Sequence, residues 1–372
     1  MQDDNIKVLY IAHYRENSGW ARAAIDYILA LDSVGVDVVC RNISVSNRFA
    51  DVPERIIELE KKETQGVTHC IQNVLPHHYV GTDKYEKNIG CFFTETEEFQ
   101  HTNWFEYLRL MDEIWCPNND LDITLEYNGL KSVNIGIPTD ISKYAQEYPI
   151  IDMGDVNHTF KFYTICDLND RKNLESTITC FHAAFDPSDP VSLVIKVKRG
   201  GMTKEELGKY VGDMCDAIKK RMRLYKDPSK YNKEVIFSWD MTDDEIMSLH
   251  ATCDCFVNTS HGEAWSIPTF DAMAMGNTPI TPRYGGPVEF CTAKLSYLID
   301  VNRAVCRCND SPFPDLFTGR DYWTNPDEEL VVEAMQKAYS LKNQDYTIDA
   351  RKKAKEFSYE SIGQKMKEQL CR

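Results

Sequence analysis

The sequence lacks any apolar run that approaches the about 18 residues needed to cross a lipid bilayer. Its acidic start, Met1-Gln2-Asp3-Asp4, is followed by neither a basic segment nor an apolar stretch, so no secretory signal peptide is expected. Basic residues are outnumbered, because 42 Lys and Arg face 58 Asp and Glu, for a formal net charge of −16. A field of this sign repels phosphate polymers and anionic lipids, which disfavours nucleic acid and membrane surfaces as partners.

Cysteine is plentiful, but the spacing of a zinc knuckle or a redox dithiol is missing. Of 13 cysteines, the close pairs Cys253/Cys255 and Cys306/Cys308 are C-x-C, and neither is the C-x₂-C of such sites. Most of the others, such as Cys91, lie in apolar stretches, where a thiol acts as a small hydrophobic group. We therefore expect a reduced, cytoplasmic protein with no bound metal.

The sequence does have a regular alternation of strand and helix patterns over 372 residues, a length typical of about two domains. Apolar runs predict strands at 6–11, 36–40, 67–74, 89–93, 113–116, 160–165, 191–197, 235–239 and 255–257. Apolar periodicity predicts helices at 21–31, 104–111, 174–185, 204–226, 243–250 and 357–370. A stretch with Pro and Gly near 138–158 separates two series. The pattern predicts an α/β protein with doubly wound parallel sheets, an N-terminal domain over 1–150 and a second over 151–345.

The segment from Ser260 to Ile280 contains the most informative pattern. It follows a predicted strand, Ser266 is placed to cap a helix, Pro268 suits its first turn, and Gly276 can end it. Backbone amides at a helix start form an anion site, which the helix dipole reinforces. The amides predicted to bind an anion belong to Ala264, Trp265, Ser266 and Ile267.

Two acids flank these amides. Glu263 precedes the helix and Asp271 lies one turn inside it, so each can accept hydrogen bonds from hydroxyls beside a bound anion. This arrangement suits a diphosphate with a sugar on each side. The alternative is that Asp271 only complements the helix dipole and that Glu263 is an ordinary loop acid, and the spacing leaves both interpretations open.

The segment resembles the signature of retaining glycosyltransferases of family 4, in which Glu, seven residues and a second Glu precede Ala-Met-Ala and a Gly. Here Glu263 and seven residues precede Asp271, which is one methylene shorter than Glu, followed by Ala272-Met273-Ala274 and Gly276. Residues 284–289 resemble the family's Gly-Gly-x-x-Glu loop, and residues 166–173 its Arg-Lys-Gly/Asn loop. The resemblance implies the GT-B fold, with two Rossmann-like domains facing across a cleft and residues 346–372 returning to the first domain.

The resemblance also implies roles for residues of the donor site. Glu263 would be catalytic and contact the donor sugar, while Asp271 would bind the ribose. Lys172, also catalytic, would stabilise the leaving diphosphate, with Arg171 and Lys196 as further donor-binding cations. An adjacent Arg-Lys pair before a helix is also common as a solvated surface pair, so that interpretation stays open.

The N-terminal half resembles the family less closely. The loop after the first strand has a single glycine, Gly19, as a candidate donor-phosphate contact. Where many members have a histidine, this sequence offers Glu95, and a separate loop carries His77 and His78. We hypothesise that these three residues lie on the acceptor side.

The resemblance, together with these residues, implies a retaining, metal-independent glycosyltransferase that needs no cofactor. Its donor would be a nucleotide-diphosphate sugar, and its acceptor a glycan, a protein or a small molecule. Two alternatives remain: a sugar-nucleotide enzyme of the same fold, such as a phosphorylase or an epimerase, and a catalytically silent nucleotide- or glycan-binding protein. The second alternative is suggested by the Asp at position 271 and by the missing histidine.

Overall fold

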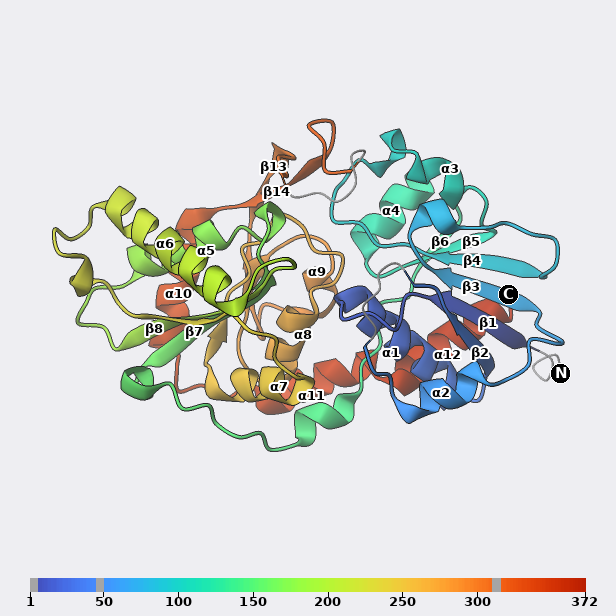
Figure 1. Ribbon diagram of the computed structural model, residues 1–372, viewed down its shortest axis with the longest axis horizontal. Coiled ribbons are helices and arrows are strands. Elements are labelled where there is room, and N and C mark those ends of the chain that lie inside the picture. The colour runs from blue at the N-terminus through green and yellow to red at the C-terminus, as the bar shows by residue number, and fades with distance from the viewer. Residues whose placement is uncertain (1–5, 45–49, 310–315) are drawn as a thin grey trace. The chain divides into compact units, whose positions relative to one another are not determined.

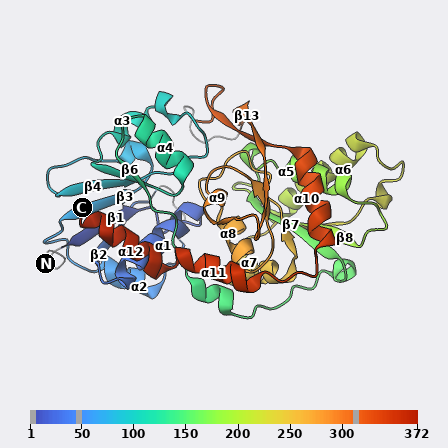
Figure 2. The ribbon, with the colours of Figure 1, turned by 180° about the vertical axis from the view of Figure 1, so that it is seen from behind.

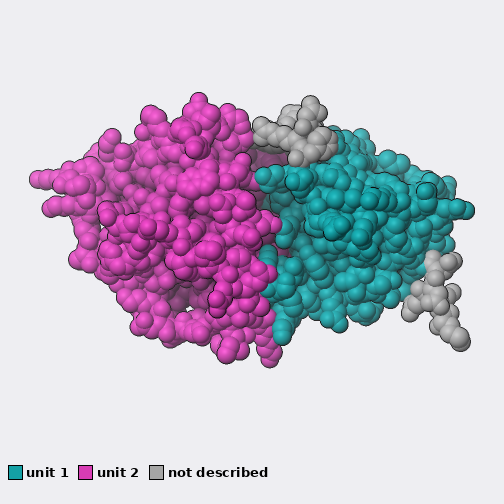
Figure 3. All heavy atoms as spheres, turned by 60° about the horizontal axis from the view of Figure 1, so that its bottom comes forward, with its two compact units in different colours: residues 1–143, 353–372 teal, residues 144–352 magenta. Residues whose placement is uncertain are grey.

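The computed structural model of the protein, shown in Figure 1, describes residues 6–44, 50–309 and 316–372. The chain divides into two compact units: residues 1–143 with 353–372 form unit 1, and residues 144–352 form unit 2 (Figure 3). Each unit contains a parallel sheet flanked by helices, so the predicted α/β class is confirmed. Within the described ranges, no helix is both long enough and apolar enough to span a membrane.

Unit 1 is built on a six-stranded parallel sheet in the order β2-β1-β3-β4-β5-β6. Its strands are β1 (Lys7–Ala12), β2 (Asp37–Asn42), β3 (His69–Asn73), β4 (Lys87–Cys91), β5 (Glu113–Cys116) and β6 (Ser132–Asn134). The central residues of β1 are buried, as expected of a strand covered on both faces. Because β2 and β3 lie on opposite sides of β1, the direction of winding reverses between β1 and β3. Such a reversal opens a crevice at the carboxyl ends of the strands, where ligands bind in sheets of this kind.

The helices of unit 1 include the C-terminal one. They are α1 (Gly19–Ser33), α2 (Glu54–Glu60), α3 (Trp104–Leu108), α4 (Asn119–Tyr127) and α12 (Tyr359–Leu370). Helix α12 packs against α1, and Figure 1 shows the two side by side. The contact is close because Gly363 lies against α1: a Cβ there would be 2.2 Å from the carbonyl oxygen of Ala30 and 3.0 Å from Cγ1 of Val34.

Replacing Gly363 with Ala is expected to lower the midpoint temperature of the first unfolding transition by about 5 °C or more. The reason is that the added methyl group meets rigid backbone of α1 and forces α1 and α12 apart. Differential scanning calorimetry measures this. Gly212→Ala, in helix α6 (Lys204–Met222), is the matched control, since a Cβ there meets no atom within 4 Å. That control should keep or slightly raise the temperature, because Ala favours helix. Equal effects of the two substitutions would show that the close packing of α12 is unimportant.

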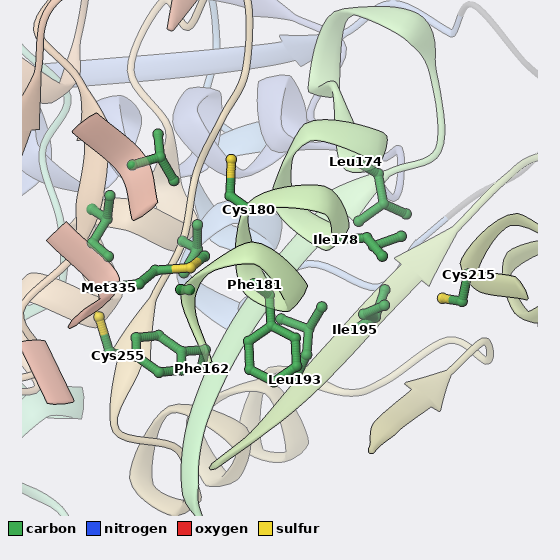
Figure 4. Close-up of a cluster of buried hydrophobic side chains, with 14 of the residues drawn as sticks. Phe162, Leu174, Ile178, Cys180, Phe181, Leu193, Ile195, Cys215, Cys255 and Met335 are labelled. Carbon is green, nitrogen blue, oxygen red and sulfur yellow. The ribbon is translucent and has the colours of Figure 1, made fainter. Parts of the chain in front are cut away.

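Unit 2 contains a four-stranded parallel sheet in the order β10-β7-β8-β9. Its strands are β7 (Phe160–Asp167), β8 (Val191–Lys198), β9 (Glu234–Phe237) and β10 (Cys255–Phe256). Helices α5 (Leu174–Ala184), α6 and α10 (Glu328–Ser340) cover one face, where Phe162, Leu193 and Ile195 are buried (Figure 4). Figure 2 shows α10 beside α5, in agreement with their contact. The alternate residues Tyr163 and Val194 pack on the opposite face with α7 (Asp243–Thr252) and α8 (Ile267–Ala274).

The winding of unit 2 also reverses, here between β7 and β10, because β8 and β10 lie on opposite sides of β7. The crevice at the carboxyl ends of β7 and β10 is therefore the expected ligand position. Two further two-stranded sheets follow in the chain, and neither was expected from the sequence. They are the parallel pair β11 (Ile280–Pro282) and β12 (Tyr297–Ile299), and the antiparallel hairpin β13 (Val301–Val305) and β14 (Tyr322–Pro326). The remaining helices are α9 (Pro287–Phe290) and α11 (Thr347–Ala354).

Candidate functional site

Two loops meet at the crevice of unit 2 and bring opposite charges together. The loop after β7 contains the short helix η6 (Asp170–Lys172), and the loop after β10 ends at Glu263. Lys172 Nζ donates to Glu263 Oε1 at 2.6 Å, and Arg171 Nη1 lies 3.3 Å from Glu263 Oε2. Residues about 90 positions apart in the sequence thus form one charged cluster at the carboxyl edge of the sheet.

Hydrogen bonds to the backbone hold the two loops together. The amide of His261 donates to the carbonyl of Arg171 at 2.8 Å, and Arg171 Nη1 donates to the carbonyl of Gly262 at 2.6 Å. Ser260 Oγ lies 3.1 Å from the carbonyl oxygen of Arg171 and 3.0 Å from that of Gly262. The position of Glu263 is therefore tied to the main chain of the cation loop, in addition to the ion pairs.

Glu263 is an ionised carboxylate in a buried position, with 8% of its surface exposed. Burial alone would raise its pKa, but the charges of Lys172 and Arg171 outweigh burial and hold the pKa below its usual range. One carboxylate compensates only one of these two cations. The three side chains together thus carry one net positive charge.

Lys196 adds a buried cation nearby. It is 4% exposed, and burial lowers its pKa. Its Nζ donates to the carbonyl of Val197 at 3.1 Å, and no carboxylate in the described part of the chain lies within ion-pair distance of it. Burial raises the pKa of the neighbouring Cys166 thiol to about 12, and the charges of Lys172, Glu263 and Lys196 all act on that thiol. Because a buried cation is costly without a counter-charge, an anion bound here would be stabilised.

Helix α8 begins beside Glu263, as the sequence predicts, and has Pro268 in its first turn. Ser266 is the N-cap residue of the helix, as predicted, but its side chain makes no hydrogen bond to the helix amides. Its Oγ lies instead 2.7 Å from Thr269 Oγ1. Ser266 has φ 70°, a left-handed conformation that costs a residue with a side chain about 1–2 kcal/mol. In the described residues, the amides of Ser266 and Ile267 have no hydrogen-bond acceptor.

Asp271 lies on α8 and is buried, as is its partner Tyr144. The Tyr144 hydroxyl donates to Asp271 Oδ1 at 2.6 Å. No pattern in the sequence predicts this contact, because Tyr144 lies far upstream in a stretch with no family motif. One carboxylate oxygen of Asp271 is thus hydrogen-bonded to a hydroxyl group of the protein.

The two glycines of the loop at 284–289 explain why that loop can approach the site. Gly285 has φ 68°, and a Cβ there would lie 2.4 Å from the carbonyl oxygen of Glu263. A Cβ on Gly286 would lie 2.2 Å from Cα of Trp265. The amide of Gly286 donates to the carbonyl of Glu263 at 3.0 Å. Side-chain-free residues are therefore required to hold the backbone at 263–265.

Three histidines gather at the crevice of unit 1. His13 directly follows β1, and His77 and His78 lie in the short helix η2 (Pro76–His78) after β3. The ring centroids of His13 and His78 are 6.1 Å apart, and those of His77 and His78 are 4.1 Å apart.

Nδ1 of His13 donates to the carbonyl of Ile43 at 2.8 Å, while its buried Nε2 has no partner in the described residues. Burial lowers the pKa of His13 and of His77. His13 was not among the predicted site residues, although its position at a strand end was a usable signal.

The remaining candidates also lie in unit 1. Glu95 is half-buried in the loop after β4, and Gly19 is the first residue of α1. Helix α1 is capped by Ser18, whose side chain accepts from the amide of Ala21 at 3.1 Å. A donor contact for Gly19 and an acceptor contact for Glu95 stay predictions.

Metal-ligating side chains do not cluster in the described ranges: no three His, Cys, Asp or Glu residues there are arranged to hold an ion. All 13 cysteines of the sequence are free thiols, and most are buried. The C-x-C pairs thus form no disulfide.

Comparison with known proteins relates this site to a family. Residues 171–305 match the family model described as Glycosyl transferases group 1. No curated protein matches the chain in sequence. Among solved structures, the protein is similar to HepE of Anabaena in complex with UDP (12% identity, 98% of this chain and 100% of the other, TM-score 0.66). It is also similar to sucrose-phosphate synthase of Thermosynechococcus elongatus, with 12% identity, 98% of each chain covered and a TM-score of 0.64. A third similar structure is a glycosyltransferase of Rickettsia africae, with 11% identity, 99% of each chain covered and a TM-score of 0.62.

These likenesses extend over nearly the whole chain and confirm the predicted GT-B fold. The family match covers both loops of the charged cluster, since it begins at Arg171 and includes the helix after Glu263. The segment that carries Lys172 and Glu263 thus matches the glycosyl transferases of group 1, and the protein is a transferase.

Proposed function

We propose that the protein is a retaining glycosyltransferase of family 4, which moves a sugar from a nucleotide-diphosphate sugar to an acceptor hydroxyl. The observation that carries this proposal is the pairing of Lys172 with Glu263 at the crevice of unit 2, beside the start of α8. HepE has been solved with UDP and with UDP-glucose, so UDP-sugars are the first donors to test. The acceptor is a glycan, a protein or a small molecule.

In this transfer the bond between sugar C1 and the diphosphate oxygen breaks. A bond from the acceptor oxygen to C1 forms on the same face, and the acceptor proton passes to the departing diphosphate. Negative charge grows on the leaving oxygen, where Lys172, Arg171 and Lys196 stabilise it. Because side-chain cations and a helix start supply this positive charge, we propose that transfer needs no metal. The free thiols support the cytoplasmic location predicted from the sequence, which stays a proposal.

Donor binding changes the partners of the charged cluster. Without donor, Glu263 is bound to Lys172. A diphosphate competes for that ammonium group and leaves the carboxylate of Glu263 to accept hydrogen bonds from sugar hydroxyls. Asp271, held by Tyr144, is proposed to meet the ribose.

A thermal-shift screen with UDP, GDP and ADP, each with and without its common sugars, tests the proposal. One nucleoside diphosphate should raise the unfolding temperature, and its sugar conjugate should be slowly hydrolysed. Release of free nucleoside diphosphate distinguishes transfer from epimerisation or phosphorolysis. Absence of a shift with every nucleotide would contradict the proposal.

Replacing Lys196 with Met is expected to weaken UDP binding about tenfold, because a buried cation is removed that has no carboxylate within ion-pair distance in the described residues. The unfolding temperature of the ligand-free protein should stay constant or rise, since the cost of burying this charge outweighs the attraction of Asp240 and Asp167. Isothermal titration calorimetry and thermal melts measure the two effects. Lys198→Met is the matched control on the same strand: Lys198 is 41% exposed and lies 3.7 Å from Asp167. Equal weakening by both substitutions would show that Lys196 has no special role.

The acceptor-side hypothesis predicts a loss confined to transfer. In His77→Ala, His78→Ala and Glu95→Ala, transfer to the acceptor should fall about fivefold or more, while donor hydrolysis by water stays nearly constant. Steady-state kinetics with varied acceptor measures this, with His101→Ala as an exposed control in the same unit. Unchanged acceptor KM and kcat in all three variants would rule the hypothesis out.

A further inference from the structure

The β13–β14 hairpin contacts the loop of Glu263 at His261. The ring of His261 stacks on Trp323, with ring centroids 4.4 Å apart and an angle of 15° between the planes. Its Nδ1 donates to the carbonyl of Thr324 at 2.8 Å. In return, the amide and the hydroxyl of Thr324 both donate to the carbonyl of His261 at 2.8 Å. Strand β14 therefore fixes both the side chain and the main chain of the residue two positions before Glu263.

The same hairpin also contacts the cation loop. Asn309 follows β13, and its amide and Nδ2 donate to Asp170 Oδ2 at 2.7 Å and 3.0 Å. Asp170 is the first residue of η6 and immediately precedes Arg171. One side of the hairpin thus contacts the anionic loop of the charged cluster, and the other side contacts its cationic loop.

The two attachments are connected within the cluster, because the amide of His261 donates to the carbonyl of Arg171. Glu263, Arg171 and Lys172, the charged groups of the cluster, all come from the segments that connect strands and helices, whose backbone is not fixed by a strand ladder. A displacement of about 1 Å at such a site can lower a rate about 100-fold. The β13–β14 hairpin contacts both loops and is therefore in a position to control the geometry of the charged cluster.

We propose that the β13–β14 hairpin sets the position of Glu263 against Arg171 and Lys172, with Trp323 and Thr324 as positioning residues that act through His261. Trp323 is 3% exposed, and its indole face supports the imidazole. The consequences for turnover rest on the proposed function, whereas the ordering of the loop does not.

The first test measures the loop itself and needs no substrate. Hydrogen–deuterium exchange of residues 258–266 is compared in the wild type, Trp323→Ala, Trp323→Phe and Tyr322→Ala. Tyr322 is the matched control, since it is the preceding residue of β14 and packs elsewhere: Cζ of Arg303 lies 3.5 Å from the centroid of its ring. Trp323→Ala should exchange about tenfold faster in this segment, and Trp323→Phe and Tyr322→Ala should stay close to wild type. Wild-type exchange in Trp323→Ala would overturn the proposal.

The second test separates positioning from general loss of structure. Trp323→Ala should lower kcat for hydrolysis of UDP-glucose or UDP-N-acetylglucosamine about 30-fold, while Kd for UDP stays within about threefold. The reason is that the diphosphate is held by Lys172, Lys196 and the α8 amides, whereas the sugar depends on Glu263. Trp323→Phe, which keeps an aromatic ring under His261, should recover most of kcat.

A parallel loss of kcat, UDP affinity and unfolding temperature in Trp323→Ala would overturn the proposal, because it would mean that the hairpin serves only stability. If the wild type neither binds UDP nor hydrolyses either sugar nucleotide, the proposed UDP-sugar donor fails instead. In that case the exchange measurement alone decides whether the hairpin orders the loop.

Discussion

Replacing Glu263 with Gln is expected to lower donor turnover about 100- to 1,000-fold while leaving UDP affinity unchanged or higher. Turnover falls because Gln lacks the charge with which Glu263 meets the sugar as its bond to the diphosphate breaks. UDP affinity does not fall, because the carboxylate that occupies Lys172 at 2.6 Å in the free protein no longer competes with the diphosphate. Hydrolysis kinetics and titration calorimetry measure these opposite effects.

Glu175→Gln is a suitable control, since Glu175 is an exposed acid in the same unit that pairs with Arg221 at 3.1 Å. A Glu263→Gln enzyme with weaker UDP binding and normal turnover would contradict the role given to this carboxylate.

The same carboxylate determines part of the pH dependence of stability. Burial acts to raise the pKa of Glu263, but Lys172 and Arg171 hold it below its usual range. A depressed folded pKa means that the ion pairs contribute fully above the unfolded pKa, about 4.3, and that their contribution is lost as the pH falls through the folded pKa. This part of the acid destabilisation should be missing in Glu263→Gln.

Replacing Lys172 with Met is expected to weaken UDP binding about 10- to 100-fold and to lower turnover further. The variant loses the ammonium group proposed to bind the diphosphate, and it also leaves Glu263 buried beside Arg171. That less compensated carboxylate repels an incoming anion. Calorimetry with UDP and hydrolysis kinetics measure both losses.

A double-mutant cycle sharpens this prediction. Lys172→Met with Glu263→Gln should bind UDP more tightly than Lys172→Met alone, because the repelling carboxylate is gone. Additive losses in the double variant would show that the two side chains act independently on the diphosphate.

Sequence patterns within a few residues were sufficient to predict the helix and the strands that surround the charged cluster. The helix after Glu263 follows from Pro268 and Gly276, whose backbone preferences act within a few residues, and the structure has α8 between them. The strands around the cluster were predicted from continuous apolar runs, because a parallel sheet is buried on both faces and so needs apolar residues on both. The cation loop was recognised through its resemblance to a family, since Arg171 and Lys172 alone also fit a surface pair.

Long-range contacts could not be predicted in the same way. Tyr144 and His13 belong to no motif, and the fold brings them to Asp271 and to the His77–His78 pair. Strand β13 was missed because it has exposed and half-buried residues without a buried face, so its apolar alternation is weak. The helix predicted to reach residue 226 ends at Met222, because Arg223 adopts φ 55° where glycine is the usual signal.

The buried position of Lys196 has a consequence for the empty protein. Burial of the Lys196 charge outweighs the attraction of Asp240 and Asp167, so the ligand-free fold is less stable than its packing alone would allow. Diphosphate bound as proposed would offset this penalty and so favour the folded state; a donor present at about 100 times its Kd would stabilise the folded state by about 2.7 kcal/mol. The lifetime of the protein in a cell would then follow the supply of its own substrate, and the difference in unfolding temperature with and without UDP is the direct measure of that dependence.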